Sequence, residues 1–144
     1  MATLERAIAI SATAHAGQLD KAGQPYILHP LRVMLRVKTE HERMAAVLHD
    51  VIEDTDVSLQ QLIDEGFPSD VVMAVDALTK RPGESRVQAA QRASTNSIAR
   101  EVKLADNAEN MDLTRIQNPS PRDFARVEEY KIVREILLNR GTVS

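Results

Sequence analysis

One twelve-residue segment, AAVLHDVIEDTD at residues 45–56, places an imidazole and three carboxyl groups within six consecutive residues. His49 and Asp50 are followed one helical turn later by Glu53 and Asp54. Because side chains three and four positions apart are neighbours on a helix, a helical conformation would gather these groups into one patch. The carboxylates would repel one another unless a cation lay between them, and a divalent metal ion would supply that charge. The same pattern is also typical of a solvated charged face, so this segment alone leaves both interpretations open.

Two further segments add groups that could complete a metal site. YILHP, residues 26–30, places His29 at the start of a predicted helix. VKLADNAENMD, residues 102–112, places three polar side chains along one helical stripe: Lys103, Asp106 and Asn110. The candidate ligand set then holds two imidazoles and two carboxylates: His29, His49, Asp50 and Asp106. Such donors suit Mn²⁺, Fe²⁺ or Zn²⁺ with positions left for water and substrate.

The elements that must position these groups are predicted to be helices throughout. We expect them over residues 3–16, 30–38, 39 to about 54, 58–66, 69–78, 86–94, 96–114 and 120–141. Thr39 with Glu42, and Ser58 with Gln61, match the capping box that opens a helix. Pro30 suits a first helical position, where its missing N–H costs nothing. No window alternates with a period of two, so the predicted fold is an all-α bundle of about seven or eight helices.

Length and composition narrow the classes of protein. The 144 residues suit one domain, which we expect to span residues 1–144, and 43% of them are hydrophobic. A net charge of -3 gives no support to a nucleic-acid partner. The absence of cysteine excludes disulfides and thiolate chemistry. No apolar run approaches the roughly 20 residues of a membrane span, and the amphipathic start does not match a signal peptide. We therefore expect a cytoplasmic protein with no membrane partner.

Five segments together resemble the HD-domain metal-dependent phosphohydrolases, whose signature is an isolated His, an adjacent His-Asp pair and a distant Asp. They are AHAGQ (14–18), DKAGQPYILHPLRV (20–33), LHDVIEDTD (48–56), ALTK (77–80) and VKLADNAENM (102–111). Within that class they look like the hydrolase domain of the bifunctional RelA/SpoT alarmone enzymes and like the stand-alone small alarmone hydrolases. The resemblance covers roughly residues 7–116. We expect no synthetase domain, because the chain has no room for one.

The resemblance implies a reaction and a role for each matching residue. These hydrolases remove pyrophosphate from the 3′ position of (p)ppGpp, usually with Mn²⁺. The resemblance implies that the metal ligands are His29, His49, Asp50 and Asp106. Glu53 and Asp54 match the pair that acts on the attacking water, and Glu53, one turn beyond His49, could reach that water without displacing a ligand. The implied substrate-binding residues are Lys21, Tyr26, Lys103 and Asn110.

Three positions depart from the bifunctional enzymes on the side that recognises the base. Asp20 stands where those enzymes commonly have a stacking Arg, Ala22 where they often have Ser, and Leu113 where they have Thr. An acid cannot stack on a purine as Arg does. We therefore expect relaxed or adenine-shifted base preference, with (p)ppApp as an alternative substrate to (p)ppGpp.

Two other functions remain open from the residues alone. The same metal core could serve a general nucleotidase or phosphodiesterase, because one scaffold can host several reactions. An HD module could also bind nucleotide without turnover. A degenerate module is expected to lose a ligand or the Glu-Asp pair, and this chain keeps them all, which favours catalysis on a small-molecule nucleotide. The sequence leaves the oligomeric state open.

Overall fold

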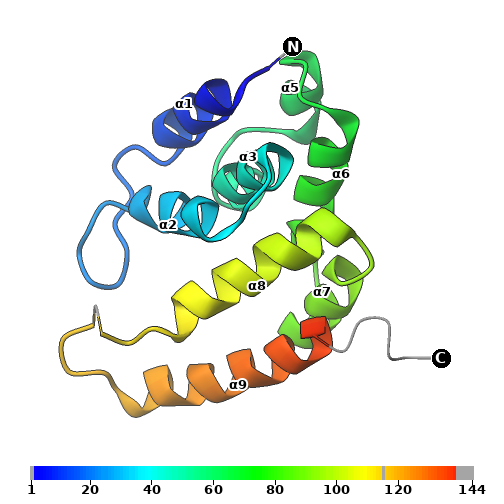
Figure 1. The fold of residues 1–144 in the computed structure, drawn as a ribbon. Coiled ribbons are helices and arrows are strands. Elements are labelled where there is room, and N and C mark those ends of the chain that lie inside the picture. The colour runs from blue at the N-terminus through cyan, green and yellow to red at the C-terminus, as the bar shows by residue number, and fades with distance from the viewer. Residues whose placement is uncertain (1, 115, 139–144) are drawn as a thin grey trace.

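The computed structural model describes residues 2–114 and 116–138, which form nine α-helices joined by loops (Figure 1). The helices are α1 (Leu4–Ala14), α2 (Leu28–Arg36), α3 (Glu40–Leu48), α4 (Val51–Asp54), α5 (Leu59–Asp64), α6 (Ser69–Leu78), α7 (Arg86–Ala93), α8 (Ser97–Met111) and α9 (Pro121–Leu138). Extended pairing in these residues is limited to one isolated bridge, Leu19 with Pro25. The predicted all-α fold is confirmed, and the helix count agrees when α3 and α4 are taken as the two parts of one predicted helix.

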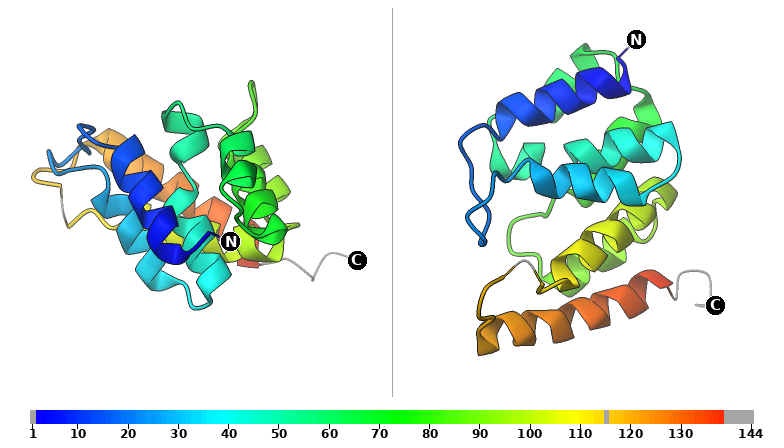
Figure 2. Two further views of the ribbon diagram at one scale, coloured as in Figure 1. Left: turned by 90° about the horizontal axis from the view of Figure 1, so that it is seen from above. Right: turned by 60° about the vertical axis from the view of Figure 1, so that its left-hand side comes forward.

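Helix α3 forms the centre of the core and packs against α1, α2, α6 and α8. Its five consecutive residues from Met44 to Leu48 are all buried. A stretch of helix that is apolar on every side must be surrounded by other elements, which explains the central place of this half of α3. Figures 1 and 2 show α1, the pair α2 and α3, α8 and then α9 stacked in succession. None of the described helices is both long and apolar enough to cross a membrane.

Helix α9 closes the bundle on the side away from α1. Val133 and Leu137 are fully buried in a small cluster with Ala90 of α7. Phe124, an apolar residue near the start of the same helix, is 55% exposed. It lies in the first turn of α9, three turns from the residues that pack on Ala90. The apolar stripe of α9 is thus buried only along its carboxyl-terminal half.

The local start signals of the helices are largely confirmed. Both predicted capping boxes form, with reciprocal bonds between Thr39 and Glu42 and between Ser58 and Gln61. The sequence predicts Pro30 at the first position of its helix, but Pro30 is the third residue of α2. The first turn tolerates it there because the first four backbone N–H groups of a helix have no partner within the helix.

Candidate active site

The predicted third helix is broken at the residues that the candidate site needs. Helix α3 ends at Leu48, and the one-turn helix α4 begins at Val51. The Ala46 carbonyl, which residue 50 would use in a continuous helix, accepts instead from the His49 backbone N–H and from His49 Nδ1 at 2.5 Å. Neighbouring residues of a regular helix point about 100° apart, so the break is what brings His49 and Asp50 together. The patch predicted from helical spacing therefore forms through a turn.

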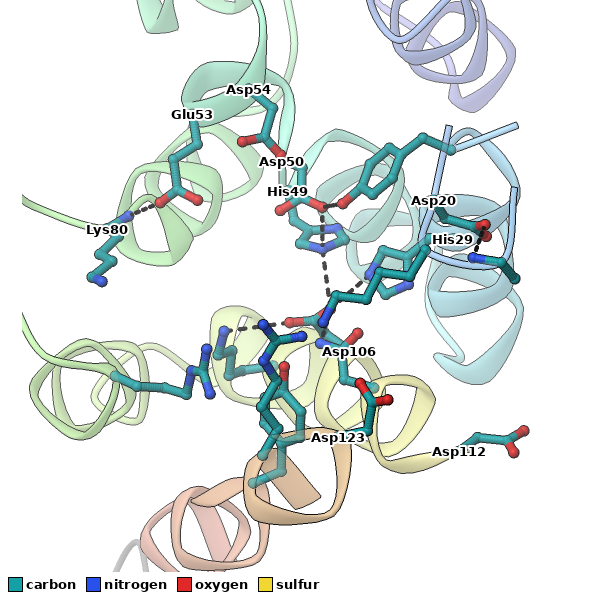
Figure 3. Close-up of a pocket in the computed structure, with 18 of the residues that line it drawn as sticks. Asp20, His29, His49, Asp50, Glu53, Asp54, Lys80, Asp106, Asp112 and Asp123 are labelled. Atoms are coloured by element: carbon teal, nitrogen blue, oxygen red, sulfur yellow. Dashed lines mark hydrogen bonds and ion pairs between the residues drawn. The ribbon is translucent and has the colours of Figure 1, made fainter. Parts of the chain in front are cut away.

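The four predicted metal ligands converge on one point at the centre of Figure 3. One donor atom from each of His29, His49 and Asp50 lies within 4.8 Å of the others. Asp106 Oδ1 lies 2.8 Å from His29 Nε2 and 3.4 Å from His49 Nε2. The four candidate ligands come from α2, the α3–α4 turn and α8, so packing of α2 and α3 on α8 brings them together.

The orientation of His49 fits a metal ligand. Its Nδ1 donates to the Ala46 carbonyl, so Nε2 is the ring nitrogen that faces Asp50, at 3.1 Å. That nitrogen is buried, and its nearest polar neighbours are the carboxylates of Asp50 at 3.1 Å and Asp106 at 3.4 Å. Burial opposes a charge on the imidazole, yet the carboxylates of Asp50 and Asp106 raise the pKa of His49 well above its usual value. The site thus stabilises positive charge at Nε2, and a divalent cation bound between His49, Asp50 and Asp106 would place its charge at the same position.

Asp106 is held by side chains from its own helix as well as by the two imidazoles. Lys103 Nζ donates to Oδ2 at 3.3 Å, and Asn110 Nδ2 donates to Oδ1 at 3.2 Å. Although burial opposes ionisation, the Lys103 charge and the bonds to the imidazoles hold the pKa of Asp106 well below its usual range. Asp106 is therefore an ionised, oriented carboxylate. Lys103 and Asn110, predicted to bind substrate, also line the cavity but make their closest contacts to Asp106.

Tyr26 is joined to the same cluster. Its hydroxyl donates to Asp50 Oδ2, and its ring lies 5.0 Å from the His15 ring and 5.6 Å from the His29 ring. Burial and the Asp50 charge raise the pKa of Tyr26, so the phenol stays neutral and remains a donor. Tyr26 thus orients a candidate ligand, a role that its predicted place among the substrate-binding residues did not include.

Tyr26→Phe should weaken metal activation while leaving the fold intact. The ring packing is kept, but Asp50 loses the donor that orients it. Loss of such an outer partner typically costs about 10–100-fold in metal affinity or activity. Titrating activity against Mn²⁺ should show a higher half-saturation concentration, and melting curves should change little. An unshifted titration would mean that the hydroxyl plays no part in the metal site.

Glu53 and Asp54 lie on α4 at the edge of the same cavity. Glu53 Oε1 accepts from the backbone N–H of Lys80 at 2.6 Å, and Figure 3 shows the side chain directed toward that loop. Burial, followed by the charges of Asp50 and Glu53, raises the pKa of Asp54. A carboxyl group with a raised pKa beside a metal-ligand set can exchange protons near neutral pH more readily than an ordinary Asp.

The cluster opens into a cavity of about 520 Å³. Besides the predicted Lys21 and Lys103, its walls carry cations that the sequence did not single out: Lys80, Arg86 and Arg126. Arg86 also lies over the ring of Tyr130, 4.8 Å from its centroid. These residues come from the α6–α7 loop, α7 and α9, and no local spacing in the sequence indicates that α9 reaches the site. The walls also carry acids, among them Asp112 and Asp123. Candidate metal donors at one end together with several cations nearby suit a ligand with several phosphates.

Asp20 lines the cavity, but one of its carboxylate oxygens is used by the loop itself. Oδ1 accepts from the backbone N–H groups of Ala22 and Gln24, both at 2.9 Å. Oδ2 lies 4.0 Å from the guanidinium of Arg32. Replacing Asp20 would therefore change the loop as well as the charge near a base. Ala22 and Leu113, the other two departures, also line the cavity.

Fold and site define the class of protein. The family model described as HD domain matches residues 7–111. The chain therefore belongs to the HD domain family, as the resemblance of its motifs indicated.

Particular relatives narrow the likeness. The chain is 40% identical over 81 residues to a guanosine-3′,5′-bis(diphosphate) 3′-pyrophosphohydrolase of Vibrio cholerae, which covers 54% of this chain and 11% of that protein. It is 33% identical over 119 residues to a GTP pyrophosphokinase of Myxococcus xanthus, and this match covers 80% of this chain and 14% of that protein. It is also 38% identical over 81 residues to the bifunctional (p)ppGpp synthase/hydrolase SpoT of Escherichia coli, and this match covers 54% of this chain and 11% of that protein. The chain thus spans only 11% to 14% of the length of these three relatives.

A solved structure resembles the whole bundle. It is that of a metazoan ortholog of SpoT, described as hydrolysing ppGpp and playing a role in starvation responses. The two chains are 25% identical and superpose with a TM-score of 0.77. The match covers 97% of this chain and 85% of the chain in the solved structure. The likeness extends beyond the HD motifs to nearly all of the fold.

Proposed function

We propose that this chain is a metal-dependent phosphohydrolase that removes the 3′-pyrophosphate from an alarmone such as (p)ppGpp or (p)ppApp. The observation that carries the proposal is the convergence of two imidazoles and two carboxylates at one end of a cavity whose walls include several cations. The named activities of the relatives support the same reaction, and we extend that activity to this chain as a proposal. We further propose that residues 1–144 act as one domain in the cytoplasm.

The proposed ligands are His29, His49, Asp50 and Asp106. A bound divalent cation would neutralise phosphate charge and polarise the bond to the departing group. We propose Mn²⁺, because mixed imidazole and carboxylate donors suit it and the resemblance to the alarmone hydrolases implies it. Metal binding needs a neutral His49, and the neighbouring carboxylates raise the pKa of this imidazole well above its usual value. Metal binding should therefore weaken as the pH falls through that raised pKa.

The remaining residues divide the work of the reaction. Glu53, with Asp54 beside it, is proposed to take and steer the proton of the attacking water. Its Oε1 is held by Lys80, which leaves Oε2 to meet the water. The cations of the cavity wall would bind phosphate oxygens, and Asn110 and Lys103 would keep Asp106 oriented while the charge on the phosphates changes.

The base is proposed to lie near the loop of residues 19–22 and the chain after α8. Four of the cavity-lining side chains there are apolar: Leu19, Ala22, Leu113 and Ile116. Apolar walls accept the face of either purine, and the stacking Arg of the bifunctional enzymes is replaced by Asp20. We therefore propose relaxed or adenine-shifted preference. Because Asp20 Oδ1 holds its own loop, the kcat/KM ratio of the unaltered protein for ppGpp and ppApp tests this preference more cleanly than a substitution does.

A panel of substrates tests the proposed function. The purified chain is incubated with Mn²⁺ and ppGpp, pppGpp, ppApp, nucleoside triphosphates or cyclic dinucleotides, and the products are separated. Release of pyrophosphate from the 3′-substituted nucleotides alone supports the proposal. Cleavage of triphosphates or cyclic dinucleotides instead would identify a general nucleotidase or phosphodiesterase. Binding of nucleotide without turnover would identify a non-catalytic module.

A further inference from the structure

The loop between α6 and α7, residues 79–85, is bonded to α7 by the guanidinium of Arg92 as well as by the capping bonds of Ser85 with Gln88. Arg92 donates to the Ala77 carbonyl at 2.6 Å and to the Thr79 carbonyl at 2.9 Å. It also donates to both carboxylate oxygens of Glu84, at 2.8 and 3.0 Å. One side chain therefore grips the loop on both sides of Lys80.

We call the bonds of Arg92 to the loop the clamp. Glu84, the acidic partner of Arg92 in this clamp, makes a second contact within the loop. Glu84 Oε1 also accepts from the Arg81 backbone N–H at 2.9 Å. The bonds from Arg92 and Arg81 lower the pKa of Glu84 to about 2, so the pair is ionised throughout the neutral range. The Arg81 side chain adds bonds to the carbonyls of Asp76 and Thr79, at 2.9 and 2.8 Å. The backbone around Lys80 is thus held by several charge-assisted bonds.

The backbone N–H of Lys80, in this restrained loop, contacts Glu53, the proposed general base. The Lys80 N–H donates to Glu53 Oε1 at 2.6 Å, as the dashed line in Figure 3 shows. Glu53 is an exposed side chain on a helix of four residues, and free Glu side chains sample many rotamers. A catalytic carboxylate must be kept close to its productive position, and the Lys80 N–H is the bond that restricts this one.

We infer that Arg92 is a positioning residue for the reaction: by clamping the loop through Glu84 and the Thr79 carbonyl, it fixes the Lys80 N–H that holds the Glu53 carboxylate. Arg92 acts without touching the substrate, through a backbone group twelve residues earlier in the chain. The inference rests on the proposed function for its kinetic consequence. The clamp itself is a separate structural statement.

Kinetics in two backgrounds test the inference. Arg92→Gln should lower kcat by about 5- to 50-fold, less than the roughly 10²–10⁴-fold expected for losing the base itself. In a Glu53→Gln background, where no base remains to be positioned, the same change should lower kcat no further. Glu84→Gln, which weakens only the ion pair, should give a smaller loss with the same dependence on Glu53. Arg6→Gln breaks a different Arg–Glu pair, with Glu65, and should leave kcat unchanged.

Hydrogen exchange at the Lys80 amide gives a readout that needs no activity. The amide should be protected in the unaltered protein and should exchange at least about 10-fold faster in Arg92→Gln and in Glu53→Ala. Equal losses of kcat with and without Glu53, or an unchanged kcat and unchanged Lys80 exchange in Arg92→Gln, would overturn the inference. A protein that hydrolyses no nucleotide but shows the predicted exchange would retain the clamp and remove the proposed function.

Discussion

Glu53→Gln should lower kcat by about 10²–10⁴-fold while leaving the fold and metal binding in place. The amide is nearly isosteric with the carboxylate, and its oxygen can still accept from the Lys80 N–H. It cannot take a proton from water, however, so the chemical step loses its base. Steady-state kinetics at saturating Mn²⁺, with melting curves and metal titrations beside them, measure the three properties separately.

Glu128→Gln is the matched control, because Glu128 is an exposed acid on α9 that pairs with Lys131. It should behave like the unaltered protein. If Glu53→Gln turned over substrate at the unaltered rate, Glu53 would be removed from the mechanism and Asp54 would be the remaining candidate.

The second large effect is expected from the buried carboxylate of α8. Asp106→Asn keeps the size of the side chain but removes the charge that faces both imidazoles and Lys103. Metal affinity should fall by more than about 100-fold, beyond the 10–100-fold typical of outer partners. Excess Mn²⁺ should restore part of the activity, because the other three donors remain. Activity measured across a range of metal concentrations checks both statements.

Asp70→Asn provides the comparison, since Asp70 is an exposed acid on α6 that contacts His41. It should leave the metal titration unchanged. An Asp106→Asn protein with unaltered metal dependence would place the metal, and with it the proposed reaction, elsewhere in the molecule.

Local signals in the sequence predicted most of the helices. A capping box needs only two residues three positions apart, so Thr39 with Glu42 and Ser58 with Gln61 could be recognised without any tertiary information. Asn96 likewise caps α8, at the start of the helix that the sequence predicts over residues 96–114. The predicted end of α8 was less accurate, because the helix ends at Met111 and the sequence predicted an end near Thr114. Fraying and capping at carboxyl ends depend on packing that short-range patterns do not contain.

The candidate site was predictable in its residues but not in how they are brought together. The break between α3 and α4 depends on the His49 ring competing for the Ala46 carbonyl, which helical periodicity cannot reveal. The contact of Lys80 with Glu53 and the approach of Arg126 to the cavity join segments far apart in the chain. The site residues could be selected by their chemistry, whereas the groups that orient them required the fold.

The most direct test of the central claim is the identity of the products formed from ppGpp. The chain is incubated with ppGpp and Mn²⁺, and the products are resolved by anion-exchange chromatography, with a parallel sample treated with a chelator. The proposed reaction predicts GDP and pyrophosphate in equal amounts, and no turnover once the metal is removed. Release of orthophosphate in place of pyrophosphate, or turnover that persists in the chelator, would contradict it.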